Sequence, residues 1–183
     1  MGAHLGRLLD SGDGSDVSFV VDGETFPAHR AVLAARSPVF KAQLLGSMAE
    51  AAMPSITLRD DIAAATFKIM LRFMYTDALP GDEELGDSPT EMLHDLLAKA
   101  DLYALERLKI LCARKLRDGL AVDTVAATLA TAEMFNCPEL KKKCFAFFAE
   151  EENLKKAELT DDFVELRKKF PSILDELNEK MGA

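Results

Sequence analysis

The chain of 183 residues contains three cysteines and three histidines, the side chains best suited to nucleophilic or metal chemistry. Cys144 could form a thiolate–imidazole pair with His29 or His94. However, Cys144 opens the apolar run Cys-Phe-Ala-Phe-Phe at 144–148, which favours a buried, inert thiol. His29 follows a predicted strand, where an imidazole can bond local backbone, so a structural role is favoured over metal or acid–base work. We therefore expect no catalytic residue.

Longer catalytic motifs are absent from the sequence. It contains no G-x-x-x-x-G-K phosphate loop, no G-x-G-x-x-G, no H-E-x-x-H and no G-x-S-x-G. The carboxylate pairs Asp60-Asp61 and Asp161-Asp162 stand at predicted helix starts, where the helix dipole favours negative charge. Helix capping explains these pairs better than acid–base chemistry. The sequence therefore predicts a protein that is not an enzyme and needs no cofactor.

The net charge and the cysteine spacing argue against nucleic-acid binding, disulfide bonds and a zinc site. The net charge is −9 with a pI near 4.9, and the small basic clusters at 141–143 and 167–169 lie in predicted helices beside acidic residues. Direct nucleic-acid binding is therefore disfavoured. Three cysteines without Cys-x-x-Cys spacing predict reduced thiols rather than disulfides or a zinc site. These residues are Cys112, Cys137 and Cys144.

The sequence also lacks membrane and export signals. No apolar run approaches the roughly 20 residues that span a bilayer, and residues 1–9 lack a signal-peptide pattern. We expect a soluble protein in the nucleus, the cytoplasm or both.

The elements that would position functional residues follow from local patterns. Residues 17–21 and 24–26 read as strands around an Asp22-Gly23 hairpin turn, and residues 55–58 as a third short strand. We expect a helix from about Pro27. Ser37-Pro38 predicts a capped helix start, and the spacing of Ser88 to Glu91 predicts a capping box.

Helices dominate the rest of the chain. Apolar residues recur at helical spacing in 63–75, and from residue 121 onward the segments 123–135, 138–150 and 160–170 all read as helices. The fold class is therefore α+β, a domain with a small sheet followed by an all-helical extension.

Four sequence motifs resemble the BTB/POZ family. They read Ser-Asp-Val-Ser-Phe at 15–19, the run from Phe26 to Phe40 with its Ala-His-Arg and Arg-Ser-Pro-Val-Phe segments, Phe-Met-Tyr-Thr-Asp at 73–77, and Ala-Asp-Leu-Tyr at 100–103 within 100–109. The resemblance covers about 16–116. It implies the BTB/POZ fold, a small sheet of short strands flanked by helices, and the later helices resemble a C-terminal BACK-type extension. The implied domains are a dimerisation helix and linker at 1–15, the BTB/POZ domain at 16–119 and the extension at 120–183.

Within that family the chain resembles the speckle-type POZ proteins and the plant MATH-BTB group. Its segment 77–92 is longer than in the animal speckle-type proteins and is similar to the plant members. Such proteins carry a MATH domain that captures substrates. The resemblance therefore implies that substrate proteins bind through a domain not present in this chain.

The resemblance also implies a cullin-3 binding site. Family adaptors use a hydrophobic-x-Glu motif after the Ser-Pro helix, and Met48 and Glu50 match it here. An apolar side chain in a partner pocket and a nearby carboxylate suit such a contact. Phe40, Tyr75 and Tyr103 match neighbouring contacts, although Phe40 and Tyr75 have the spacing of core residues as well.

Homodimerisation is the second implied property. Leu5 and Leu8 match apolar positions on the family's N-terminal dimer helix, and Val32 matches a dimer position on the His-bearing helix. Packing against a two-fold partner would remove the exposure of these leucines. The alternative is that Leu5 and Leu8 cover their own domain.

These implications describe a homodimeric adaptor that binds the cullin-3 N-terminal domain and recruits substrates for ubiquitination and proteasomal degradation. Two alternatives stay open at this point. One is a BTB co-repressor-binding module, and the other is a purely structural oligomerisation module like the tetramerising BTB of potassium channels. No Cys/His spacing of zinc fingers accompanies the co-repressor alternative.

Overall fold

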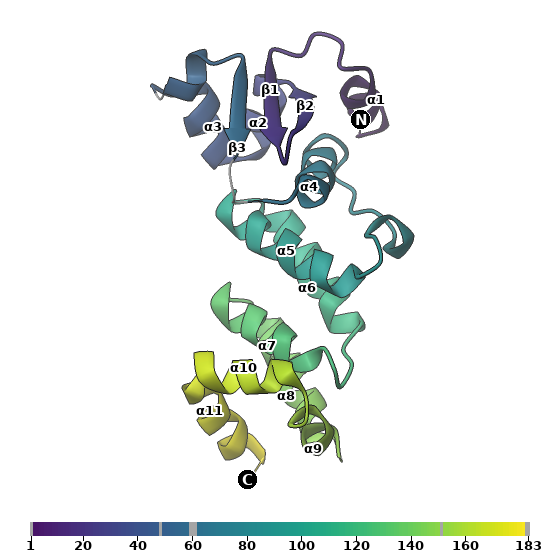
Figure 1. Ribbon diagram of the computed structural model, residues 1–183, viewed down its shortest axis with the longest axis vertical. Coiled ribbons are helices and arrows are strands. Elements are labelled where there is room, and N and C mark those ends of the chain that lie inside the picture. Colours follow the sequence, from purple (N-terminus) through teal and green to yellow (C-terminus); the bar gives the residue numbers. More distant parts are fainter. Residues whose placement is uncertain (1, 48, 59–61, 151, 182–183) are drawn as a thin grey trace. The chain divides into compact units, whose positions relative to one another are not determined.

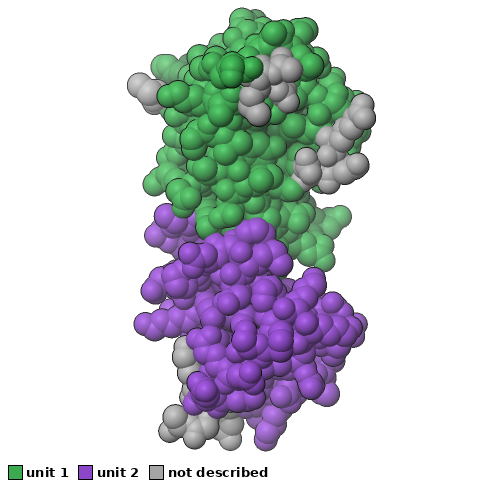
Figure 2. All heavy atoms as spheres, turned by 90° about the vertical axis from the view of Figure 1, so that its left-hand side faces the viewer, with its two compact units in different colours: residues 1–109 green, residues 110–183 purple. Residues whose placement is uncertain are grey.

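A computed structural model describes residues 2–47, 49–58, 62–150 and 152–181. Met48, Asp60 and Asp61 lie outside the described residues. The chain forms two compact units, residues 1–109 and 110–183 (Figures 1 and 2). The division falls within α6 (Glu106–Asp118). The domain boundary expected at 119/120 stays a prediction.

The first unit is built around a three-stranded sheet. β1 (Val17–Val21) pairs antiparallel with β2 (Glu24–Ala28) and parallel with β3 (Ser55–Leu58), in the order β2-β1-β3. Asp22 and Gly23 join β1 to β2 with φ angles of 49° and 82°. Two successive positive φ angles belong to the tight hairpin turn that Asp-Gly predicts, so that prediction is confirmed.

The expected helix start at Pro27 is wrong. β2 continues through Ala28, and α2 spans Arg30–Arg36. Pro27 is tolerated because β2 is an edge strand, where a missing N–H costs little. The backbone N–H of Asp16 donates to the Ala28 carbonyl at 3.1 Å, which extends the strand pairing to that residue.

Helices make up most of the rest of the first unit. They are α1 (Gly2–Ser11), α2, α3 (Pro38–Leu45), α4 (Ala64–Thr76) and α5 (Pro89–Leu102), with short 3₁₀ turns at η1 (Ala49–Ala52) and η2 (Asp82–Glu84). The ring of Phe19 on β1 packs against Phe40 of α3 and Phe67 of α4, with centroids 5.6 and 5.3 Å away. All three side chains are fully buried. The α+β prediction is therefore confirmed.

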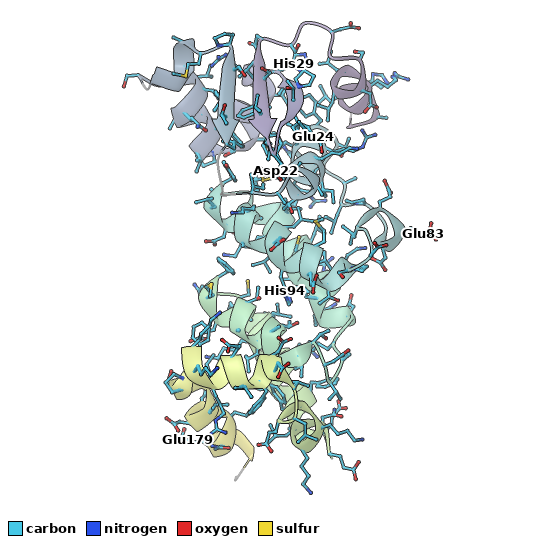
Figure 3. All side chains as sticks on the ribbon, viewed as in Figure 1. Asp22, Glu24, His29, Glu83, His94 and Glu179 are labelled. Atoms are coloured by element: carbon cyan, nitrogen blue, oxygen red, sulfur yellow. The ribbon has the colours of Figure 1, made fainter. Side chains whose placement is uncertain are left out.

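Two helix starts differ from the simple capping rules. The Ser88 side chain makes no cap hydrogen bond, so the predicted capping box is wrong. α4 begins after Ala63, which has no side-chain acceptor. Instead, Asp22 in the hairpin turn accepts from the Ala64 N–H at 2.8 Å (Figure 3). A residue from a distant turn thus caps α4.

The second unit contains helices throughout its described part. After the end of α6 come α7 (Val125–Met134), α8 (Pro138–Ala149), α9 (Asn153–Ala157), α10 (Asp161–Lys169) and α11 (Pro171–Met181). Thr160 caps α10 by accepting from the Phe163 N–H at 3.3 Å, and Asp161 and Asp162 lie in its first turn. The capping interpretation of that acidic pair fits this placement. No helix of the described residues is long and apolar enough to cross a membrane.

Candidate protein-interaction surface

The thiols are poorly suited to chemistry. Cys112 and Cys144 are fully buried, and burial raises the pKa of each to about 12. Both thiols are therefore protonated at neutral pH, whereas a nucleophile needs the thiolate. Among the described residues, no group of three or more His, Cys, Asp or Glu side chains is arranged to hold a metal ion.

Ser37, Phe40 and Tyr103 form a buried cluster that fixes the start of α3. The Ser37 hydroxyl accepts from the Phe40 N–H at 3.1 Å and donates to the Tyr103 carbonyl at 2.6 Å. The rings of Phe40 and Tyr103 are stacked, with centroids 4.6 Å apart and planes 9° apart. The exposed fractions of these two residues are 0% and 6%. The cluster therefore joins α3 to the end of α5.

Tyr75 and His29 form a second buried connection. The Tyr75 hydroxyl accepts from the His29 backbone N–H and pairs with its Nδ1, both at 2.8 Å, while Nε2 lies 2.9 Å from the Asp13 carbonyl. A carbonyl can only accept, so Nε2 donates to it, and in the neutral ring Nδ1 is then the acceptor for the Tyr75 hydroxyl. Burial raises the pKa of Tyr75 to about 12. The network gives His29 the backbone-bonding role that we expected.

Arg30 connects the start of α2 to the backbone at either end of the segment 45–53, which begins with the last residue of α3. Its Nη1 donates to the Leu44 carbonyl at 3.1 Å and its Nη2 to the Met53 carbonyl. Its backbone N–H donates to Asp16 Oδ1 at 2.8 Å, and its Nε donates to the Asp16 carbonyl at 3.3 Å. One side chain thus connects α3 to Met53, two residues before β3, and to Asp16, just before β1.

Three of the five residues predicted to bind cullin-3 have side chains that the structure describes. Met48 lies outside the described residues, and the side chain of Glu50, within η1, lies outside them too. Phe40, Tyr75 and Tyr103 are buried, with Tyr75 2% exposed. They therefore lie beneath the surface and can shape it rather than cover it. Their assignment as contacts stays a prediction.

Two exposed apolar residues at the ends of the segment 45–53 were not predicted from the sequence. Leu45 at the end of α3 is 57% exposed, and Met53 just before β3 is 45% exposed. Large apolar side chains with this exposure are candidates for a protein contact when they lie close together.

The predicted dimer residues remain partly accessible. Leu5, Leu8 and Val32 are each half-buried. α1 packs on α4, and a Cβ on Gly2 would come within 2.5 Å of the Thr76 carbonyl oxygen. α1 therefore covers part of its own unit while part of each leucine stays accessible. Both interpretations of these leucines keep support.

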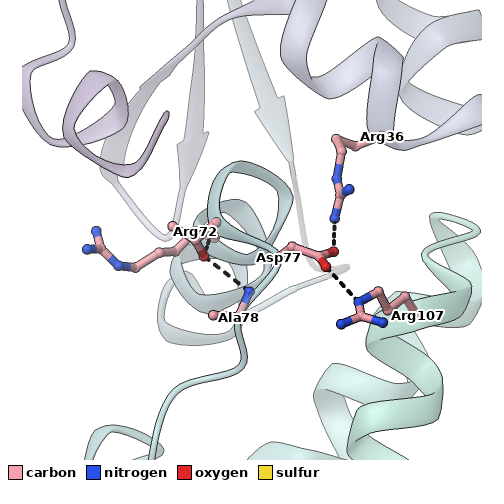
Figure 4. Close-up of polar contacts among 6 residues, drawn as sticks. Arg36, Arg72, Asp77, Ala78 and Arg107 are labelled. Carbon is pink, nitrogen blue, oxygen red and sulfur yellow. Dashed lines mark hydrogen bonds and ion pairs between the residues drawn. The ribbon is translucent and has the colours of Figure 1, made fainter. Parts of the chain in front are cut away.

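Asp77 ends α4 and connects three helices of the first unit. It has a positive φ of 60°, and its carboxylate bonds Arg36 of α2 and, at 2.7 Å, Nε of Arg107 in α6 (Figure 4). The hydrogen bond from Arg36 is the main cause that lowers the pKa of Asp77. This ion-pair cluster anchors the start of the acidic segment 77–88.

The rest of that acidic segment folds back on α4. Leu85 is 1% exposed and holds the segment against the core. A hollow of about 320 Å³ lies between it and α4, with Lys68, Ile69 and Arg72 on one side and Met92 at the start of α5. The segment is therefore an ordered part of the first unit.

Known proteins resemble this chain along its whole length. The BTB/POZ domain model matches residues 5–120, and the BPM/SPOP BACK domain model matches residues 124–178. "BTB/POZ and MATH domain-containing protein 3" of Arabidopsis thaliana is 44% identical over all of this chain and 46% of its own length. "BTB/POZ and MATH domain-containing protein 4" from the same plant is 41% identical over 97% of this chain and 39% of its own length. The chain spans less than half the length of these relatives.

Proposed function

Because the chain belongs to the BTB/POZ family and carries a BACK region of the BPM/SPOP type, we propose that it is a homodimeric adaptor for a cullin-3 ubiquitin ligase. BTB/BACK adaptors are non-enzymatic proteins that act through protein partners. In this role the chain binds the cullin-3 N-terminal domain and holds it near a substrate. Dimerisation would raise the effective concentration of both partners.

The segment after α3 carries the proposal. Arg30 donates hydrogen bonds to the carbonyls of Leu44 and Met53, at either end of the segment 45–53. Exposed Leu45 and Met53 are the first and last residues of this segment. The hydrophobic-x-Glu pattern of Met48 and Glu50 lies between them in the sequence. Exposed apolar residues with a carboxylate close by in the sequence suit a helical partner that offers apolar and cationic side chains. Phe40, Tyr75 and Tyr103 are buried, so in this proposal they shape the first unit that carries the segment.

Substrate recruitment is assigned to a separate domain. The relatives are named as containing a MATH domain, and the chain matches less than half of their length. We place substrate capture in such a domain and proteasomal degradation of the ubiquitinated substrate downstream, in the nucleus or cytoplasm.

Calorimetric titration with the cullin-3 N-terminal domain tests the proposal. We expect sub-micromolar affinity for the chain and loss of about 100-fold or more for the double variant Met48→Asp, Glu50→Ala, since a buried charge would replace the apolar anchor. Met134→Asp is the matched control, because Met134 is an exposed methionine, 55% accessible, in the second unit. It should bind like the wild type.

Two results would overturn the proposal. One is a folded wild-type dimer that binds no cullin-3, and the other is equal loss of binding in the Met134→Asp control. Binding to a co-repressor peptide in the first case would favour the co-repressor alternative. A tetramer without either affinity would favour a structural oligomerisation module.

A further inference from the structure

Arg30 makes hydrogen bonds that the local pattern of α2 does not require. A residue at the first position of a helix needs no side-chain contact to a distant loop, yet the Arg30 guanidinium donates to the carbonyls of Leu44 and Met53. These acceptors lie 14 and 23 residues away along the chain. The planar guanidinium fork holds both acceptors at a fixed spacing, which a flexible ammonium group cannot do.

The backbone and the Nε of Arg30 are also held in place by hydrogen bonds. Asp16 accepts from the Arg30 backbone N–H through its carboxylate and from Nε through its carbonyl. Next to it, Ser18 of β1 donates its N–H to the Pro54 carbonyl at 2.9 Å and its hydroxyl to the same oxygen at 3.3 Å. Arg30 and Ser18 thus fix consecutive carbonyls, those of Met53 and Pro54.

From this geometry we propose that Arg30 is a positioning residue for the cullin-binding surface. It holds the backbone of Leu44 and Met53 at one spacing, and thereby positions the segment 45–53, at whose two ends exposed Leu45 and Met53 lie, for a helical partner. The inference rests on the proposed function, which names that partner. Arg30 touches the partner nowhere in this scheme and acts through the backbone.

The placement of Arg30 also joins the two proposed interfaces. It is the first residue of α2, and half-buried Val32, a predicted dimer contact, lies two positions later on the same helix.

The test uses the full 183-residue chain with Arg30→Lys and Arg30→Gln. Each variant keeps a methylene chain and an N–H donor but removes the planar guanidinium group, so folding is retained more readily than in Arg30→Ala. We expect hydrogen exchange in the segment 45–53 of the free protein to accelerate at least about fivefold, because its end contacts are lost. Cullin-3 binding should weaken about tenfold, since binding must then order the segment. Arg117→Ala, which removes an arginine paired with neighbouring Asp118, should change neither.

The two readouts separate this inference from the proposed function. Hydrogen exchange in the segment 45–53 is measured without any partner. If the wild type binds no cullin-3, the proposed function is wrong, and the exchange result still decides whether Arg30 positions this segment. Unchanged exchange in a folded Arg30→Lys protein overturns the inference. Faster exchange with unchanged cullin affinity overturns it as well, because the ends would then be irrelevant to binding.

Discussion

The Ser37 hydroxyl and the Tyr103 carbonyl oxygen lie 2.6 Å apart, and this bond joins the start of α3 to the end of α5. The same hydroxyl accepts from the Phe40 N–H. Ser37 thus caps one helix and satisfies a buried carbonyl at the end of another. Its side chain connects two segments that are 66 residues apart in the sequence.

Ser37→Ala should destabilise the first unit by about 2 kcal/mol, because a helix cap and a buried carbonyl both lose a partner. Ser88→Ala is a matched control: Ser88 also precedes a proline at a helix start, but its side chain makes no cap bond, so we expect a change near zero. The chain has two tyrosines and no tryptophan, and both tyrosines lie in the first unit. Urea unfolding followed by tyrosine fluorescence therefore reports on that unit. Equal effects of the two variants would contradict this role of Ser37.

Tyr75→Phe should destabilise the same unit by about 1–3 kcal/mol. The change removes the partner of the His29 N–H and Nδ1 while leaving the ring packing in place. The remaining tyrosine provides the fluorescence signal for urea unfolding. A double-mutant cycle with His29→Ala should show that the two effects are not additive. Simple additivity would show that the hydroxyl stabilises the fold without His29.

Stability should depend on Asp77 in a defined pH range. The pKa of Asp77 is lowered in the folded state, so its ion pairs stabilise the fold above the unfolded-state pKa of about 3.9, and this contribution is lost as the pH falls through the folded value. We expect wild type to melt above Asp77→Asn at pH 7, and this difference to shrink as the pH falls below about 4 and through the lowered folded-state pKa. Exposed Asp87 in the same acidic segment provides the control variant Asp87→Asn. A difference between wild type and Asp77→Asn that does not shrink with falling pH would point to a cause other than charge.

The proposed dimer should dissociate when Leu5 and Leu8 are both changed to Asp. Two carboxylates at a desolvated apolar interface would raise the dissociation constant by about 100-fold or more. Sedimentation equilibrium should give twice the chain mass of 20.1 kDa for the wild type and the monomer mass for the variant. Leu159→Asp, on a leucine that is 87% exposed in the second unit, should leave the mass unchanged. A variant that stays dimeric would assign these leucines to their own domain.

The thiols of Cys112 and Cys144 should resist alkylation at pH 8. Their pKa values of about 12 leave almost no thiolate, and both side chains are fully buried. Peptide mass spectrometry after an hour in iodoacetamide should find both thiols unmodified, and labelling should appear after unfolding in urea. Fast labelling of the folded protein at Cys144 would revive the enzyme alternative.

Local rules were sufficient for much of the fold. The Asp22-Gly23 turn, the Ser37 cap and the helical periodicity of 63–75 depend on residues within a few positions of each other, and each is present in the structure. The same kind of rule was wrong at Ser88 and at Pro27. At Ser88 the capping spacing exists without its hydrogen bond, and at Pro27 sheet pairing extended an edge strand. In the second case tertiary pairing outweighed local preference.

For the candidate surface, the sequence placed the hydrophobic-x-Glu segment after α3 but did not distinguish buried residues from surface residues. Phe40 and Tyr75 match both contact and core patterns, and only packing against the sheet and α5 shows that their side chains are buried. Leu45 and Met53 were missed because exposure is a property of the assembled surface rather than of spacing.

By itself, then, the sequence determined the order of the elements, the family motifs and the absence of catalytic motifs, since each depends on residue type and short spacing. The tertiary structure decided which distant groups meet. Asp22 caps a helix 42 residues away, Tyr75 bonds His29 46 residues away, and Arg30 holds both ends of the segment 45–53. Such partners are chosen when packing brings polar groups out of water and each must find a hydrogen bond, a requirement that no short stretch of sequence can reveal.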